Sequence, residues 1–143
     1  MKALLLPAVV LILWTLFMFG WMARARFAAM AAAGMDLSKA APGGRGQDLE
    51  AVLPKPTLWK AHNLTHLHEQ PTLFYAVVGF LALLGAHGPL PVALAWAYVL
   101  LRIVHSIYQS TVNVVRVRFM LFALSTLCLL GLAIVALLAA LSA

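Results

Sequence analysis

The chain has 143 residues, of which 64% are hydrophobic and only 10% are charged. This composition excludes an ordinary soluble domain, in which roughly 25% of the residues are charged, because a fold of this size has too little interior for so much apolar surface. The formal net charge of +6 would suggest nucleic-acid binding in a soluble protein, but here the basic residues flank apolar runs, so we expect lipid head groups and no nucleic acid as their partners. We therefore predict one all-α domain over residues 1–143, an integral membrane four-helix bundle in the lipid bilayer.

The first predicted helix covers residues 4–27. Its apolar run resembles the hydrophobic part of a signal peptide, but it extends over about 20 residues, whereas such parts run for roughly 7–15. Arg24 and Arg26 follow at once, as in an anchor that is retained. We therefore expect this segment to remain as a transmembrane helix, followed by a polar loop over residues 34–56.

Three more helices are predicted at residues 57–85, 90–112 and 115–141. The first of these has a polar first half and an apolar second half, and Pro71 between them predicts a kink, because proline lacks the N–H that a helix interior needs. A turn with two glycines and a proline at residues 85–89 ends it. The boundary between the last two helices is marked only weakly.

Lysine and arginine are distributed unequally between the two ends of the predicted bundle. Those beside the first and third loops are Arg24, Arg26, Lys39, Arg45, Lys55, Lys60, Arg116 and Arg118, and the opposite end has only Lys2. Loops rich in positive charge stay in the cytoplasm. We therefore predict a multi-pass protein of the cell membrane with both basic loops cytoplasmic and both termini on the non-cytoplasmic side.

The helix predicted at residues 90–112 carries polar residues where a membrane span should be apolar. A charged side chain such as Arg102 costs roughly 2.5–3.5 kcal/mol inside a span, so it faces the bundle interior or water. The polar positions of this helix are Arg102, His105, Gln109, Asn113 and Arg116. At about 100° per residue they fall within a sector of roughly 80° around the helix axis. Asn113 and Arg116 belong to this sector only if the helix continues beyond its predicted end. This stripe must face other helices or a wet cavity.

The polar half of the helix at residues 57–85 has a similar face, formed by His62, Thr65, His66 and Glu69. Glu69 is the only acid near a membrane segment, so it needs a cation, and we predict an ion pair with Arg102. Such a pair could simply fix helix packing, but the basic groups outnumber this acid, which favours a pocket for an anionic ligand. The spacing of His62 and His66 would also suit a metal ion, but the HExxH pattern is missing and we expect no metal.

Three segments of the chain together resemble the MAPEG family, the membrane-associated proteins in eicosanoid and glutathione metabolism. Residues 63–75, with Glu69 and Pro71, resemble the signature of the second helix in a bacterial branch of that family. Residues 95–108 resemble the third helix, and residues 113–119 resemble the start of the fourth. The resemblance implies a MAPEG-like homotrimer of four-helix subunits that binds glutathione between neighbouring subunits near the cytoplasmic face.

The resemblance also implies roles for individual residues. It makes glutathione the cofactor and assigns its contacts to His66, Glu69, Arg102, His105 and Tyr108. An arginine at the start of the fourth helix stabilises the thiolate in the family's enzymes, and both Arg116 and Arg118 fit this catalytic position. The chain departs from the well-studied enzymes at His66, where they carry asparagine, and at Gln109, where they carry tyrosine.

These observations leave alternative functions open. The first is a glutathione S-transferase or peroxidase that acts on lipophilic small molecules, electrophiles that would arrive through the bilayer. The second is a non-catalytic membrane protein on the same scaffold that binds lipid or a partner. A transporter that uses the polar stripe is a third, although only Pro71 hints at the discontinuous helices typical of transporters.

Overall fold

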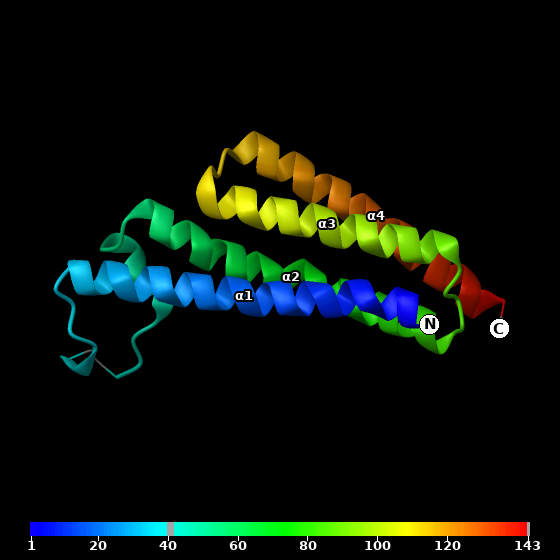
Figure 1. Cartoon of the computed structure of the whole chain (residues 1–143), viewed down its shortest axis with the longest axis horizontal. Coiled ribbons are helices and arrows are strands. Elements are labelled where there is room, and N and C mark those ends of the chain that lie inside the picture. Colours follow the sequence, from blue (N-terminus) through cyan, green and yellow to red (C-terminus); the bar gives the residue numbers. More distant parts are fainter. Residues whose placement is uncertain (40–41, 143) are drawn as a thin grey trace.

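Four long helices account for most of the chain in the computed structural model, which describes residues 1–39 and 42–142 (Figure 1). They are α1 (Lys2–Ala32), α2 (Lys55–Leu83), α3 (Pro89–Thr111) and α4 (Val115–Leu141). The loop between α1 and α2 contains two short 3-10 helices, η1 (Leu37–Lys39) and η2 (Gly46–Ala51). The expected all-α bundle is thus confirmed, and the described residues form no strand.

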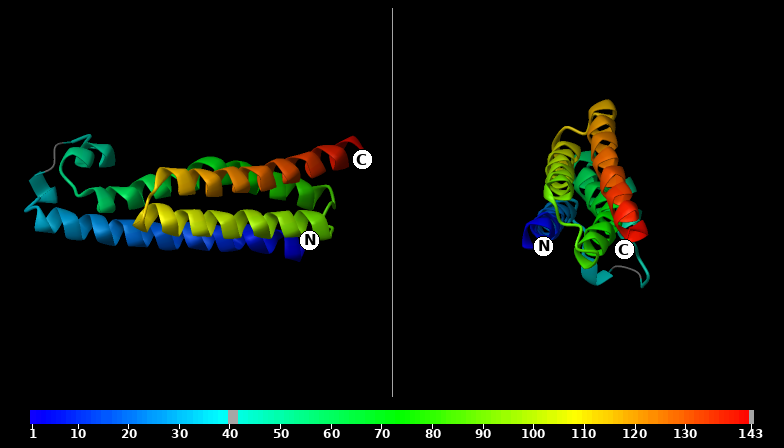
Figure 2. Two further views of the ribbon diagram at one scale, coloured as in Figure 1. Left: turned by 90° about the horizontal axis from the view of Figure 1, so that it is seen from above. Right: turned by 90° about the vertical axis from the view of Figure 1, so that its right-hand side faces the viewer.

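The helices pack as two antiparallel pairs. α1 lies along α2 and α3 lies along α4, and contacts of α3 with both α1 and α2 join the two pairs (Figures 1 and 2). Both termini lie at one end of the bundle together with the α2–α3 turn, and we call this the terminal end. The α1–α2 loop and the α3–α4 turn lie at the opposite end, which we call the loop end.

The apolar core fills the terminal half of the bundle. Its centre is the ring of Phe74 on α2, which stacks on that of Tyr98 on α3 with centroids 4.3 Å apart. Around it lie side chains without any exposed surface, among them Leu4, Leu11, Leu81 and Leu132. In lipid such packing holds helices together mainly through van der Waals contact, because the surroundings are as apolar as the core.

Three of the described helices are long and apolar enough to cross a membrane, namely α1, α3 and α4. α2 lies beside them, but the polar residues of its first half keep it out of this class. It continues as one helix through Pro71, whose side chain is buried. Many large apolar side chains of the bundle are exposed on its outside, which suits lipid contact. The chain is a multi-pass membrane protein.

Candidate functional site

Arg102 is the centre of a polar cluster at the loop end, where α2, α3 and α4 meet. Its side chain is only 1% exposed, and Nη2 donates a hydrogen bond of 2.7 Å to the carbonyl oxygen of His66. The guanidinium also lies 5.7 Å from the ring centroid of Phe122 on α4, a cation–π distance. Its Nε and Nη1 atoms have no hydrogen-bond partner. The cluster therefore contains a buried positive charge with free donors.

The predicted ion pair between Glu69 and Arg102 is wrong for the single chain. The side chain of Glu69 is 59% exposed, and its Oε2 atom lies 3.0 Å from Nδ1 of His66, one turn earlier on α2. Arg102 meets the main chain of α2 rather than this carboxylate, because the acid lies on the outward face of the helix. The carboxylate thus has a partner in His66, and in the single chain it needs no buried cation.

His66 and His105 bring α2 and α3 together beside Arg102. Their rings meet edge to face with centroids 6.2 Å apart. His105 is only 3% exposed and its Nδ1 atom has no partner, whereas the side chain of His66 is 39% exposed. The positive charges of Arg102 and Arg118 both act on the ring of His105. The cluster is therefore shielded from the outside at His105 on α3 and accessible from the outside at His66 on α2.

The two arginines at the start of α4 are placed differently. Nη1 of Arg118 donates to Oδ1 of Asn113 at 2.9 Å, and its side chain is half-buried. Arg116 is exposed and forms no ion pair among the described residues. Asn113 sits in the turn with a φ of 57°, a left-handed conformation that asparagine tolerates better than most residues. Arg118 is thus the arginine held toward the cluster.

Tyr108 and the end of the predicted stripe make none of the side-chain contacts that form the cluster among the described residues. Tyr108 is half-buried, and its hydroxyl forms no hydrogen bond with the described residues. Arg102, His105 and Gln109 face inward as predicted, but α3 ends at Thr111, so that Asn113 falls in the turn rather than on the stripe.

The structure also buries polar residues that were not predicted to belong to the site. Nδ2 of Asn63 donates to Oγ of Ser106 at 2.7 Å, and both side chains are fully buried between α2 and α3. Neither amide atom of Gln109 nor the hydroxyl of Ser110 has a partner. Asn63 begins the segment that resembles the family signature but was not among the predicted site residues, although it lies four residues before Leu67 and thus continues the face that α2 buries.

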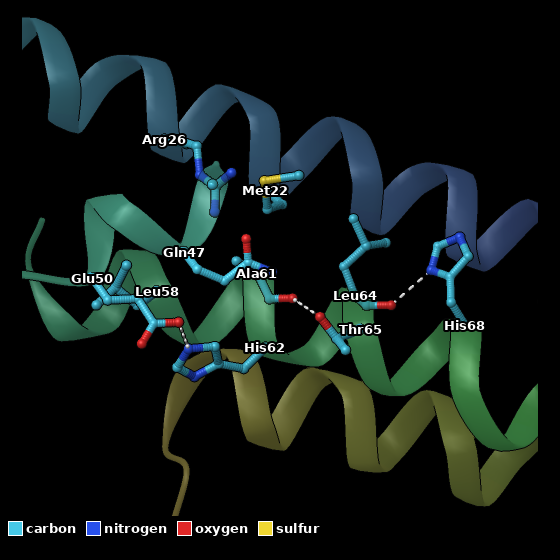
Figure 3. A pocket seen from close by; sticks show the side chains of 11 residues that line it. Met22, Arg26, Gln47, Glu50, Leu58, Ala61, His62, Leu64, Thr65 and His68 are labelled. Atoms are coloured by element: carbon cyan, nitrogen blue, oxygen red, sulfur yellow. Dashed lines mark hydrogen bonds and ion pairs between the residues drawn. The ribbon is translucent and has the colours of Figure 1, made fainter. Parts of the chain in front are cut away.

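A cavity of about 370 Å³ lies on another side of α2, between α1, η2 and α2 (Figure 3). Its polar lining includes Arg26, Gln47 and His68, while Nε2 of His62 is bonded to Oε1 of Glu50 at 3.1 Å. His62 and Thr65 of the predicted polar face of α2 line it, whereas the residues expected to contact glutathione and the two arginines of α4 do not. Sequence periodicity could not predict it, because one wall comes from the irregular loop.

No group of three or more histidine, cysteine or acidic residues in the ranges 1–39 and 42–142 could hold a metal ion. The polar cluster is instead suited to an anion, since cations and hydrogen-bond donors predominate in it.

Comparisons with known proteins identify the family of the chain. No curated protein and no solved structure gives a significant match to the chain. The family model described as "MAPEG family" matches residues 4–138, which includes all four long helices apart from their outermost residues. The chain therefore belongs to the MAPEG family.

Proposed function

We propose that this protein is a glutathione S-transferase or peroxidase that acts on lipophilic electrophiles. The observation that carries the proposal is unbalanced positive charge at the loop end. Arg102 keeps two free nitrogen donors, and no acid among the described residues forms an ion pair with it or with Arg116 or Arg118. A buried charge is costly without a partner, and the two carboxylates of glutathione would supply one.

The chemistry follows from the same charges. The thiolate, not the thiol, is the nucleophile, and a nearby cation stabilises it. Arg118 is the better candidate for this role, because it is half-buried and held by Asn113, whereas Arg116 is exposed. Arg102 has almost no exposed surface. We therefore expect it to attract the ligand through its positive charge rather than to contact the ligand directly.

A homotrimer is the assembly that we propose, with the ligand between neighbouring subunits. In the single chain the outward face of α2 exposes polar groups at the level of the cluster, among them Thr65 and Glu69. Lipid would cover such a face only at a cost, whereas a second copy could offer hydrogen bonds. Native mass spectrometry from detergent should show a trimer, and a monomer that retains glutathione binding would contradict the assembly.

The membrane orientation is also a proposal. We expect the loop end in the cytoplasm because most of the lysine and arginine residues flank its loops. A Cys128→Ala, Arg45→Cys double variant should resist a membrane-impermeant thiol reagent in intact cells and react after lysis. Ready labelling of intact cells would reverse the orientation.

Equilibrium binding of glutathione to the purified protein tests the function. We expect Arg118→Gln to weaken binding about tenfold or more, the value of one charge-assisted hydrogen bond of about 1.5 kcal/mol. Arg102→Lys should weaken it less, because it keeps the buried positive charge that we assign to this position. Arg45→Gln, which removes an exposed loop charge, is the matched control and should bind normally.

Turnover of a generic aromatic electrophile with glutathione completes the test. Formation of the thioether by the wild type, and its loss in Arg118→Gln, would support the transferase. If the wild type does not bind glutathione at millimolar concentration, the enzyme reading is wrong, and a non-catalytic scaffold that binds lipid or a partner takes its place.

A further inference from the structure

Three histidines in the polar half of α2 each have one ring nitrogen engaged. The contacts are His62 Nε2 with Glu50 Oε1 at 3.1 Å, His66 Nδ1 with Glu69 Oε2 at 3.0 Å, and His68 Nδ1 with the carbonyl oxygen of Leu64 at 2.8 Å. His62 and His68 line the cavity beside α1 (Figure 3). Only His66 lies in the cluster with Arg102 and His105.

The contact with Glu69 determines which nitrogen of His66 carries the proton. An ionised carboxylate can only accept a hydrogen bond, so Nδ1 of His66 must be the donor. In the neutral imidazole Nε2 then has a free lone pair. The side chain is 39% exposed, so a ligand can reach it. The carbonyl oxygen of the same residue accepts from Arg102, which fixes this turn of α2 against α3.

We propose that His66 is the general base of the site, that its Nε2 takes the proton from the thiol of glutathione, and that Glu69 is a positioning residue that holds the required tautomer. The inference rests on the proposed function. A nucleophile, a base within reach of it and a third group that orients the base form the usual arrangement for activating a weak nucleophile.

Addition of the thiol to an activated alkene shows how the step balances. The S–H bond breaks, its proton moves to Nε2 of His66, and the electron pair stays on sulfur. The thiolate then forms a bond to the electrophilic carbon, and the electron pair of the double bond moves to the neighbouring carbon. That carbon takes the proton back from Nε2, so the imidazole ends neutral and no oxidant or reductant is required.

The charges around His66 come from three helices. Glu69 lies beside it on α2, Arg102 and His105 face it from α3, and Arg118 on α4 acts on the neighbouring ring of His105. A pH profile measured in such a cluster belongs to the coupled groups rather than to one residue. The assignment to His66 therefore needs variants that change one group at a time.

The test is the pH dependence of kcat/KM for glutathione addition by the full-length protein. We expect the rate of the wild type to rise with pH to a plateau. His66→Asn keeps a polar side chain but no base, and it should lower the rate on the plateau by about 10²–10⁴-fold and remove the inflection. Glu69→Gln should keep the inflection but lower the rate on the plateau, because the carboxylate no longer holds the tautomer in which Nε2 is free.

His68→Asn is the matched control, because it removes a histidine of the same helix whose Nδ1 is also engaged. Its pH profile should equal that of the wild type. An inflection that survives in His66→Asn overturns the inference while the transferase stands. Absence of glutathione binding to the wild type overturns the proposed function and this inference with it.

Nitrogen NMR of labelled histidine gives a readout that does not depend on turnover. We expect His66 in the Nδ1–H tautomer in the wild type and a mixture of tautomers in Glu69→Gln, while His68 stays unchanged in both. An Nε2–H tautomer of His66 in the wild type would leave no lone pair for the thiol proton and overturn the inference, even if glutathione binds.

Discussion

The two halves of the bundle use different contacts at the interface between α2 and α3. In the terminal half the buried side chains are apolar, and Phe74 stacks on Tyr98 without any exposed surface on either. In the loop half the same α2–α3 interface buries Asn63, Arg102 and Gln109, several of whose polar atoms have no partner. Unpaired buried groups reduce stability, so their concentration at one end marks the end where a ligand is expected.

The largest effect should come from the apolar half. Phe74→Ala removes the ring that contacts Tyr98 and leaves a void that helices in lipid cannot easily fill, so we expect a loss of about 3–5 kcal/mol in the free energy of unfolding. Titration of the purified protein with a denaturing detergent measures it. A loss below about 1 kcal/mol would mean that the two halves do not differ in packing as we describe.

In the polar half, replacement of Gln109 should raise the free energy of unfolding rather than lower it. Both of its amide atoms are buried without a partner, so Gln109→Leu should stabilise the protein by about 1–2 kcal/mol, the penalty of an unsatisfied polar group. The matched control is Gln70→Leu, because Gln70 bonds to both Tyr98 and Thr126 and its loss should destabilise. Equal destabilisation by both variants would show that Gln109 has a partner in the assembled protein.

A smaller effect is expected at the hydrogen bond between Asn63 and Ser106. A double-mutant cycle with Asn63→Ala and Ser106→Ala should give a coupling energy of about 0.6 kcal/mol, the average for polar contacts between membrane helices. The same detergent titration measures it. A coupling energy indistinguishable from zero would indicate that each side chain finds another partner when the other is removed.

Sequence periodicity predicted which face of α3 is inward, because helical spacing alone brings Arg102, His105 and Gln109 to one side. It could not predict the partner of Arg102. That choice depends on the rotation of α2, which places the carbonyl oxygen of His66 rather than the carboxylate of Glu69 against the guanidinium. Net charge and periodicity are the same for both arrangements.

The same limit applies to the arginines of α4 and to the loop. Arg116 and Arg118 lie two residues apart and both fit the resemblance, and only the hydrogen bond to Asn113 distinguishes them. The wall that η2 contributes to the α1–α2 cavity has no regular period. Within it the guanidinium of Arg26 lies close to Gly46, where a Cβ atom would lie 2.7 Å from Nη1.

The α3–α4 turn limits which residues could replace Asn113. This single position must adopt a left-handed backbone and also accept a hydrogen bond from Arg118. Glycine would satisfy the backbone and release the arginine, whereas glutamine would offer the amide but strain the turn. Aspartate is the one other residue that could do both, and it would neutralise the charge that the site uses. The position should therefore tolerate almost no substitution, even though its side chain is only half-buried.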